Sequence, residues 1–185
     1  MMPEISLNIL DIAENSTRAG ASLVTIEVAV DTAADTMTVV IADDGCGMTK
    51  EQVASVTDPF FTTRTTRKVG LGVPFLKQAA EMTGGSFLIE SELGVGTTVT
   101  AVFGYSNIDR QPLGDMDGTI LTLIECHTEV DFRYIYRYNE KSFELDTREM
   151  REILGGVPLN TQDVMGFIRQ YLKENRADTD GGAVY

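Results

Sequence analysis

The stretch DIAENSTRAGA, residues Asp11–Ala21, begins a series of four short motifs in the N-terminal half of the chain. It is followed by DDGCGM at Asp43–Met48, by PFFTTR at Pro59–Arg64 running into GLGV at Gly70–Val73, and by GVGTT at Gly94–Thr98. They supply a helix that carries a carboxylate and an amide, an aspartate before glycines, a basic glycine-rich segment and a late Gly-Thr strand. Each motif alone is common, but their order in one chain predicts a site for a metal-bound nucleotide.

The overall composition argues against several classes of function. The chain has 185 residues, a formal net charge of −13 and a sequence pI near 4.4, which disfavours nonspecific binding to nucleic acid or anionic lipid. The first residues, Met1–Glu4, lack a basic and apolar leader, and no apolar run reaches membrane-spanning length. Cys46 and Cys126 form no disulfide framework, and a single histidine disfavours a zinc site. We therefore expect a cytoplasmic protein without a membrane or nucleic-acid partner.

The N-terminal half combines helical and strand patterns. Ile5, Ile9, Ile12 and Ser16 fall on one helical stripe, which predicts a helix over Leu7–Arg18. The mixture of helices with closely spaced strands predicts an α+β fold built as a two-layer α/β sandwich. Strands are expected at Leu23–Val30, Met37–Ala42, Ser86–Ser91 and Thr97–Phe103, with helices after the Thr49–Gln52 capping box and after Gly72.

The composition changes at Gly104–Asp117, a polar stretch that is typical of a linker. We therefore expect a domain over residues 1–106, a linker over 107–118, a small α+β region over 119–175 and a flexible tail over 176–185. In the C-terminal region the patterns predict strands at Thr119–Glu125, Val130–Tyr138 and Ser142–Leu145, a short helix after Asp146, and a longer helix capped by Asn160.

Asp11 and Asn15 are four residues apart, so a helix places both on one face. The amide oxygen of Asn15 is a hard ligand of the kind that Mg²⁺ prefers. A carboxylate one turn earlier could orient or deprotonate an attacking hydroxyl or water. The alternative is that both residues are surface polar groups on an amphipathic helix.

Asp43 stands where an apolar strand runs into Gly45 and Gly47. A carboxylate there could accept a hydrogen bond from the exocyclic amine of adenine, and the glycines would let a flat base approach the backbone. The alternative is a common Asp-Gly turn. Thr97 or Thr98 could contact adenine through water, or could simply suit a strand.

Arg64, Arg67 and Lys68 cluster in an acidic chain directly before Gly70-Leu71-Gly72. Glycines before a helix leave free backbone N–H groups at the positive end of the helix dipole, which is a ready site for an anion. Cations beside that site fit a triphosphate. The alternative is a basic loop that balances nearby acidic residues.

Together the motifs resemble the GHKL superfamily of gyrase, heat-shock chaperone, histidine-kinase and mismatch-repair ATPases. Asp11–Asn15 is similar to its N-box, Asp43–Gly47 to its first glycine box and Pro59–Arg64 to its F-box and lid start. Gly70–Val73 resembles the second glycine box and Gly94–Thr98 the last one. The likeness runs from Ile5 to Phe103 and implies a Bergerat-type sandwich, in which a mixed, mainly antiparallel sheet lies under helices.

This resemblance also implies roles for individual residues. Asn15 would bind Mg²⁺, Asp43 would bind adenine, and Arg64 would replace the lid lysine that contacts the γ-phosphate. Asp11 would be the catalytic carboxylate, but hydrolytic members carry glutamate there, and the shorter aspartate has roughly 1.5 Å less reach, which predicts slow hydrolysis. Glu14 is an alternative carboxylate that points about 100° away from this face. Further nucleotide contacts are expected from Gly45, Gly47, Met48, Phe60, Thr63, Lys68, Gly70, Leu71, Gly72, Val73 and Thr97.

The motifs point to more than one branch of the superfamily. ENSTRAGA is similar to the mismatch-repair form of the N-box, whereas DPFFTTR followed by GLGV is similar to histidine kinases. The only histidine, His127, lies in an expected strand region and outside any dimerisation helix. We therefore expect a stand-alone kinase-like module for signal transduction, resembling the anti-sigma-factor serine kinases, that phosphorylates an unidentified protein partner and could form a homodimer. The alternatives are a non-catalytic ATP-gated interaction switch and a mismatch-repair-like ATPase.

Overall fold

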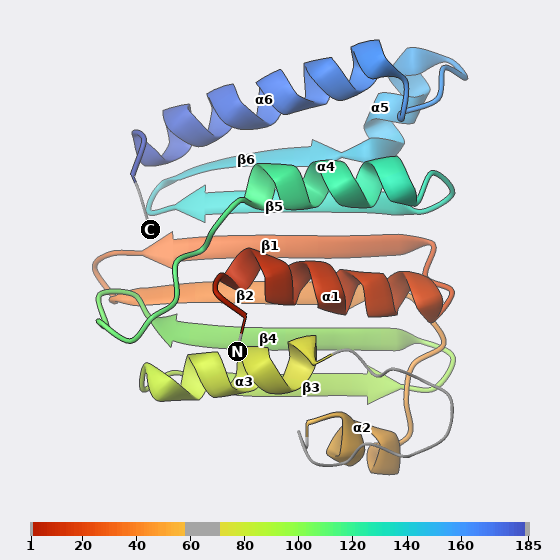
Figure 1. Cartoon of the computed structure of the whole chain (residues 1–185). Coiled ribbons are helices and arrows are strands. Elements are labelled where there is room, and N and C mark those ends of the chain that lie inside the picture. The colour runs from red at the N-terminus through yellow and green to blue at the C-terminus, as the bar shows by residue number, and fades with distance from the viewer. Residues whose placement is uncertain (1, 58–70, 184–185) are drawn as a thin grey trace.

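The computed structural model describes residues 2–57 and 71–183, and these residues form an α+β architecture (Figure 1). In chain order the elements are α1 (Ile5–Arg18), β1 (Leu23–Asp31), β2 (Thr36–Asp43), α2 (Lys50–Val56), α3 (Gly72–Met82), β3 (Ser86–Glu92), β4 (Gly96–Gly104), α4 (Met116–Cys126), β5 (Asp131–Tyr138), β6 (Lys141–Asp146), α5 (Thr147–Leu154) and α6 (Gln162–Asp180). No helix in this described part is both long and apolar enough to cross a membrane.

The strands form a single mixed sheet in the order β3-β4-β2-β1-β5-β6. Only β1 and β5 pair in parallel, and the other neighbouring strands are antiparallel. The predicted mixed, mainly antiparallel sheet is therefore confirmed. Because β5 pairs with β1, strands from both sides of the expected linker belong to one sheet (Figure 1). The division of the chain into domains stays a prediction.

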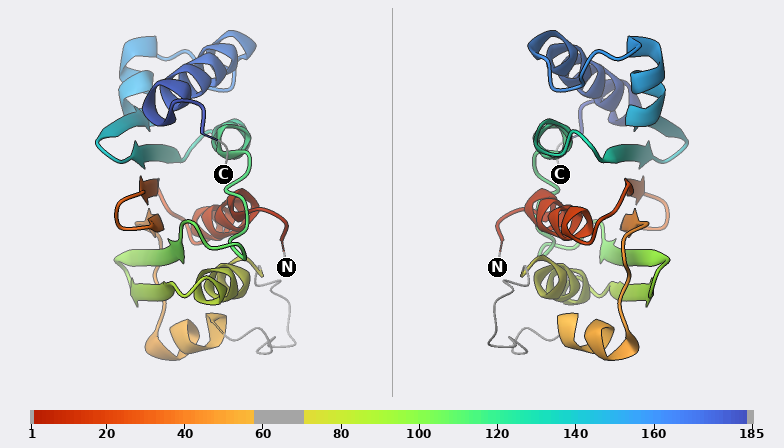
Figure 2. Two further views of the ribbon diagram at one scale, coloured as in Figure 1. Left: turned by 90° about the vertical axis from the view of Figure 1, so that its left-hand side faces the viewer. Right: turned by 90° about the vertical axis from the view of Figure 1, so that its right-hand side faces the viewer.

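Helices α3, α1, α4 and α6 lie side by side over one face of the sheet, which gives the predicted two layers (Figure 2). The strands alternate accordingly: in β1 the residues that face the helices are Val24, Ile26, Val28 and Val30, each at most 2% exposed. Burying such β-branched side chains under a helical layer is the main favourable term in the stability of this architecture.

The predicted elements of the N-terminal half are present. Ile5, Ile9, Ile12 and Ser16 are all buried on the inner side of α1, as the helical stripe indicated. The capping box at the start of α2 is also formed, because Thr49 Oγ1 accepts from the Gln52 backbone and Gln52 Oε1 accepts from the Thr49 backbone.

The strand expected at Thr119–Glu125 is wrong, because these residues lie in helix α4. Its β-branched residues suggested a strand, but Met116, Ile120 and Ile124 recur at helical spacing and are all buried in the core. Asp115 begins the helix by accepting a hydrogen bond from Gly118 N at 2.8 Å. Packing of the apolar stripe thus overrides local β-propensity. His127, expected in a strand region, directly follows Cys126, the last residue of α4, and is its C-cap residue.

Helix α6 extends over residues expected to be a flexible tail, since it ends at Asp180. Arg176 pairs with Asp117 at 3.0 Å, and Tyr136 Oη donates to Asp180 at 3.0 Å, so tertiary contacts hold the last turns in place. The helix begins after Thr161 rather than after the expected Asn160.

Candidate nucleotide-binding site

The carboxylate of Asp43 is held from two sides at the end of β2. Ser16 Oγ, on α1, donates to Asp43 Oδ2 at 2.6 Å, and the backbone N–H of Gly45 donates to Asp43 Oδ1 at 2.9 Å. Ser16 is 3% exposed, whereas Asp43 is only half-buried. The carboxylate is therefore fixed in orientation while its remaining lone pairs can accept from a ligand. A role of Asp43 in binding was expected from its motif, but nothing in the sequence indicated that Ser16 would orient it.

The turn after Asp43 is anchored by Asp44, which accepts from the backbone N–H groups of Ser22 and Leu23 at 2.7 and 2.9 Å and from the Ser22 hydroxyl. Burial alone would raise the pKa of Asp44, but these hydrogen bonds outweigh burial and lower it. The loop that carries Asp43 is thus tied to the start of β1.

Glycine is required at Gly47, where φ is +68°. A Cβ atom there would also lie 1.9 Å from the backbone oxygen of Glu92, so no side chain fits without moving the β3–β4 hairpin. Gly45 has more room than Gly47, but an added Cβ would still lie 3.0 Å from that of Ala19, which is a tight contact. The first glycine box is therefore locked between α1 and the hairpin, consistent with close approach of a ligand to its backbone.

Ser91, on β3, links the first and last glycine boxes and was not indicated by the sequence. Its hydroxyl accepts from Met48 N at 2.8 Å, donates to Gly96 O at 3.0 Å, and lies 2.7 Å from Thr97 Oγ1. Thr97 is paired with Asp43 across β2 and β4. The expected contacts Met48, Thr97 and Asp43 are thus brought together at one end of the sheet.

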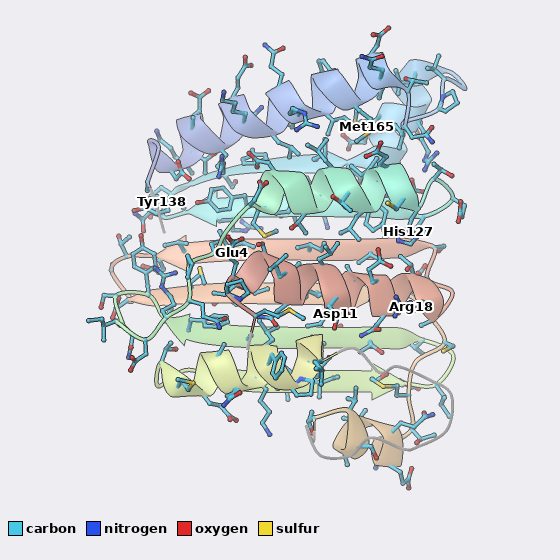
Figure 3. The ribbon with its side chains drawn as sticks, viewed as in Figure 1. Glu4, Asp11, Arg18, His127, Tyr138 and Met165 are labelled. Atoms are coloured by element: carbon cyan, nitrogen blue, oxygen red, sulfur yellow. The ribbon has the colours of Figure 1, made fainter. Side chains whose placement is uncertain are left out.

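Asp11 joins the N-box to the second glycine box. Its Oδ2 accepts from the backbone N–H of Gly72, the first residue of α3, at 2.7 Å. The residue before this helix, Leu71, provides no side-chain cap, so the cap comes from α1 instead. Figure 3 shows Asp11 midway along α1. The resemblance implied a catalytic role for Asp11, and the geometry adds a structural contact with the start of α3.

Asn15 and Glu14, the other two polar residues of α1 considered for metal binding or catalysis, have different surroundings. Asn15 lies one turn after Asp11 and is half-buried. An oxygen of Glu14, the alternative carboxylate, lies 2.8 Å from Nε2 of His127. His127 lies just beyond the end of α4 (Figure 3). Glu14 is therefore directed toward the C-terminal region, whereas Asp11 contacts Gly72.

A comparison with known protein families places this geometry in context. Residues 2–107 match the family described as histidine kinase-, DNA gyrase B-, and HSP90-like ATPase, and this match covers more than half of the chain. The chain belongs to this ATPase family. Membership implies ATP binding, and the matched residues include every part of the site described above.

Three bacterial proteins are similar in sequence to part of this chain. A protein of Shewanella frigidimarina named as a sensor protein is 30% identical over 108 residues, which cover 57% of this chain and 16% of that protein. The "Non-motile and phage-resistance protein" of Caulobacter vibrioides is 32% identical over 114 residues, which cover 58% of this chain and 14% of that protein. A protein of Bacillus subtilis named as a C4-dicarboxylate sensor kinase is 28% identical over 86 residues, which cover 46% of this chain and 16% of that protein. The matched region is thus a small part of each relative.

Five of the expected nucleotide contacts lie outside the described residues: Phe60, Thr63, Arg64, Lys68 and Gly70. Their roles stay predictions. The rest of the second glycine box forms the start of α3, where Leu71 is exposed while Gly72 and Val73 are buried.

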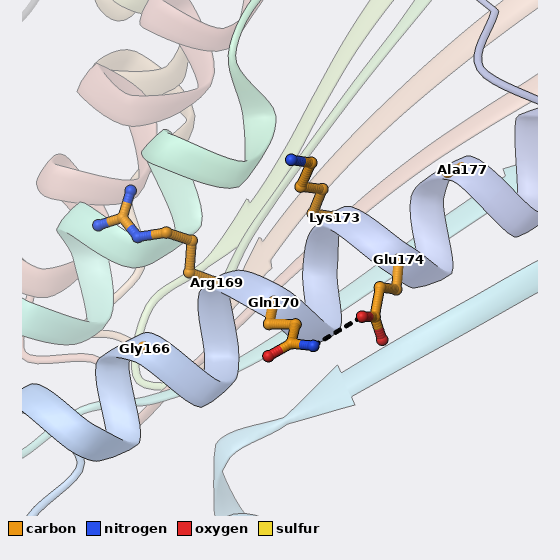
Figure 4. A pocket seen from close by; sticks show the side chains of 6 residues that line it. All are labelled: Gly166, Arg169, Gln170, Lys173, Glu174 and Ala177. Atoms are coloured by element: carbon orange, nitrogen blue, oxygen red, sulfur yellow. Dashed lines mark hydrogen bonds between the residues drawn. The ribbon is translucent and has the colours of Figure 1, made fainter.

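Two surface hollows in the described part do not coincide with the expected nucleotide contacts. One, of about 490 Å³, runs along the outer side of α6 between Gly166 and Ala177 (Figure 4). The other, of about 450 Å³, lies between the end of α1 and the α4–β5 connection. Neither is lined by Asp43 or Asn15. The nucleotide site is therefore identified by its hydrogen-bonding groups and by the family match.

Proposed function

We propose that the chain is a Mg-ATP-binding regulatory module that transfers the γ-phosphoryl group to a partner protein in signal transduction. The observation that carries this proposal is the carboxylate of Asp43, which Ser16 and Gly45 hold ready to accept from an adenine amine. Two of the similar relatives are named as a sensor protein and a sensor kinase, which supports a kinase-like activity.

The donor set of the site fits a nucleotide that brings its own metal. The described residues contain no group of three or more His, Cys, Asp or Glu side chains that could hold a metal by themselves. We infer that Asn15 supplies one oxygen ligand to Mg²⁺ and that phosphate oxygens and water supply the others, which is usual for this ion. Mg²⁺ would neutralise charge on the phosphates during transfer.

Asp11 is the proposed catalytic carboxylate and would accept the proton of the attacking hydroxyl. Its contact with Gly72 N and its short side chain both support slow hydrolysis by the protein alone. The acceptor is proposed to come from another chain, because the histidine of this chain, His127, is half-buried and lies 2.8 Å from Glu14. A cytoplasmic location and a homodimer remain further expectations.

A second candidate is a non-catalytic switch whose interaction with a partner depends on bound ATP. The contact between Asp11 and Gly72 favours it, since a carboxylate already engaged by a backbone N–H is less available as a base. A mismatch-repair-like ATPase is the third candidate and rests on the ENS sequence at Glu14–Ser16.

The test is incubation of the protein with γ-labelled ATP and Mg²⁺, alone and with an extract that contains candidate partners. Label on a partner supports the kinase, whereas free phosphate alone supports the ATPase. ATP binding without either product supports the switch. Asp43→Asn serves as the control, because any labelling that survives in this variant comes from a contaminating enzyme. Absence of ATP binding by the wild-type protein would overturn all three candidates.

A further inference from the structure

The start of α3 offers few backbone donors, and Asp11 occupies one of them. Leu71 gives no side-chain cap, and Pro74 has no N–H, so Gly72 and Val73 are the donors among the first three helical residues. Asp11 Oδ2 accepts from Gly72 N at 2.7 Å. A carboxylate of the protein itself thus lies where a helix N-terminus would attract a phosphate.

Gly72 is packed directly against this carboxylate. An added Cβ atom would lie 2.7 Å from Asp11 Oδ2 and 3.1 Å from the backbone oxygen of Asn8, although the φ angle of Gly72 lies outside the left-handed region. The glycine is therefore needed for the close approach of α1 to α3. Phosphate and the Asp11 carboxylate would compete for the same N–H group, since both are anionic acceptors.

Asn8 provides the second observation. It lies three residues before Asp11 on α1, so the two side chains are neighbours on one helix face. Asn8 is fully buried, and within residues 2–57 and 71–183 neither the nitrogen nor the oxygen of its amide has a hydrogen-bond partner. An unpaired buried amide is costly, and a native protein that keeps one needs a reason for it.

We propose that Asp11 is a positioning residue that holds the start of α3 until phosphate replaces its carboxylate on Gly72 N. The displaced carboxylate then accepts from the side-chain amide of Asn8, which explains why that amide is kept unpaired. This inference rests on the proposed function, because it concerns the phosphate end of the same nucleotide site. This exchange releases the Asp11 carboxylate, which is also the proposed general base, from Gly72 N only after a phosphate has bound.

Three variants of the full-length protein test this exchange through the affinity for ADP and for adenosine, measured by calorimetry. Asp11→Asn is expected to bind ADP roughly tenfold more tightly, because the internal competitor is weakened, while adenosine affinity is unchanged. Asn8→Leu is expected to be more stable without nucleotide but to bind ADP several-fold more weakly, since the displaced carboxylate loses its partner. Glu14→Gln removes a carboxylate from the same helix without touching Gly72, and should leave ADP affinity unchanged.

The amide resonance of Gly72 gives a readout in the wild-type protein that does not depend on a variant. This resonance should shift on addition of ADP or pyrophosphate. In Asp11→Asn without nucleotide, it should already lie at a different position from that of the wild-type protein. If Asp11→Asn and Glu14→Gln raise the affinity for ADP equally, the effect is general charge repulsion, and the proposed exchange on Gly72 N is wrong. Unchanged ADP affinity in Asn8→Leu would show that Asn8 does not receive the displaced Asp11 carboxylate. Failure of the wild-type protein to bind either ligand would instead overturn the proposed function.

Discussion

The hydroxyl of Ser16 donates to Oδ2 of Asp43 at 2.6 Å and joins α1 to the end of β2. Ser16 follows Asn15 directly, so one helical segment supplies both the proposed metal ligand and the group that orients the proposed adenine ligand. The base end and the phosphate end of the site are therefore coupled through α1.

We expect Ser16→Ala to weaken ATP binding by roughly tenfold, because a net hydrogen bond to a charged group contributes about 1.5–3 kcal/mol. The loss should be equal for ATP and adenosine, since Ser16 acts through Asp43 on the base. Calorimetry of both ligands measures it. Wild-type affinity for both ligands in Ser16→Ala would show that Ser16 does not orient Asp43 for binding.

Asp43→Asn should abolish measurable nucleotide binding and leave the fold intact. The amide presents a donor where adenine requires an acceptor, and it also loses a charged hydrogen bond, which costs on the order of 1.5–3 kcal/mol before any mispairing. Calorimetry and a thermal melt of the variant would check both statements. Wild-type affinity for ATP would remove Asp43 from the site.

Asn15→Ala should leave adenosine binding nearly unchanged and reduce the dependence of ATP affinity on Mg²⁺. The reason is that Asn15 is proposed to contact the metal and not the base. Titrations of ATP with Mg²⁺ and with a chelator measure the difference. If adenosine and Mg-ATP lose affinity equally, the assignment of Asn15 is wrong.

Gly47→Ala should be strongly destabilising, because the new Cβ would lie 1.9 Å from Glu92 O and the residue has a φ of +68°. Gly94→Ala is the matched control: φ is +77° there, but an added Cβ meets nothing within 4 Å. Both variants carry the backbone strain, so the difference between their free energies of unfolding in urea measures the cost of the collision between the new Cβ and Glu92 O. Equal losses would show that strain alone requires glycine at Gly47.

Asp117 predicts an unusual pH dependence of stability. Burial raises its pKa above the ordinary value of 3.8, the nearby Arg176 lowers it in part, and Asp115 and Asp180 raise it further. Between 3.8 and the raised pKa the folded state binds more protons than the unfolded state, so stability falls as pH rises through that window. In urea unfolding, Asp117→Asn should therefore gain stability relative to wild type as pH rises from 3.8 through the raised pKa of Asp117.

Asp146 gives the opposite sign and serves as the control for Asp117. The hydrogen bond from the Arg148 side chain lowers the pKa of Asp146, so its contribution to stability is present above 3.8 and is lost as pH falls through the folded-state pKa. Asp146→Asn should lose stability relative to wild type mainly at neutral pH. The same direction of change for both variants would contradict the assignment for Asp117.

Elements whose pattern is local could be predicted from the residues alone. The stripe Ile5, Ile9 and Ile12 predicted α1, and the run of residues with high β-propensity in Leu23–Val30 predicted β1, because both signals are read from neighbouring residues. The ordered motifs also identified the family, since each depends on residue types at fixed short spacing.

Features that depend on partners far apart in the sequence become visible only in the folded chain. Thr119–Glu125 is helical because Ile120 and Ile124 pack into the core, and α6 continues to Asp180 because contacts such as Arg176–Asp117 hold its last turns. The bonds from Ser16 to Asp43 and from Gly72 to Asp11 span 27 and 61 residues of sequence. No local pattern encodes such pairs, because they form only when the sheet brings α1 to the end of β2 and to the start of α3.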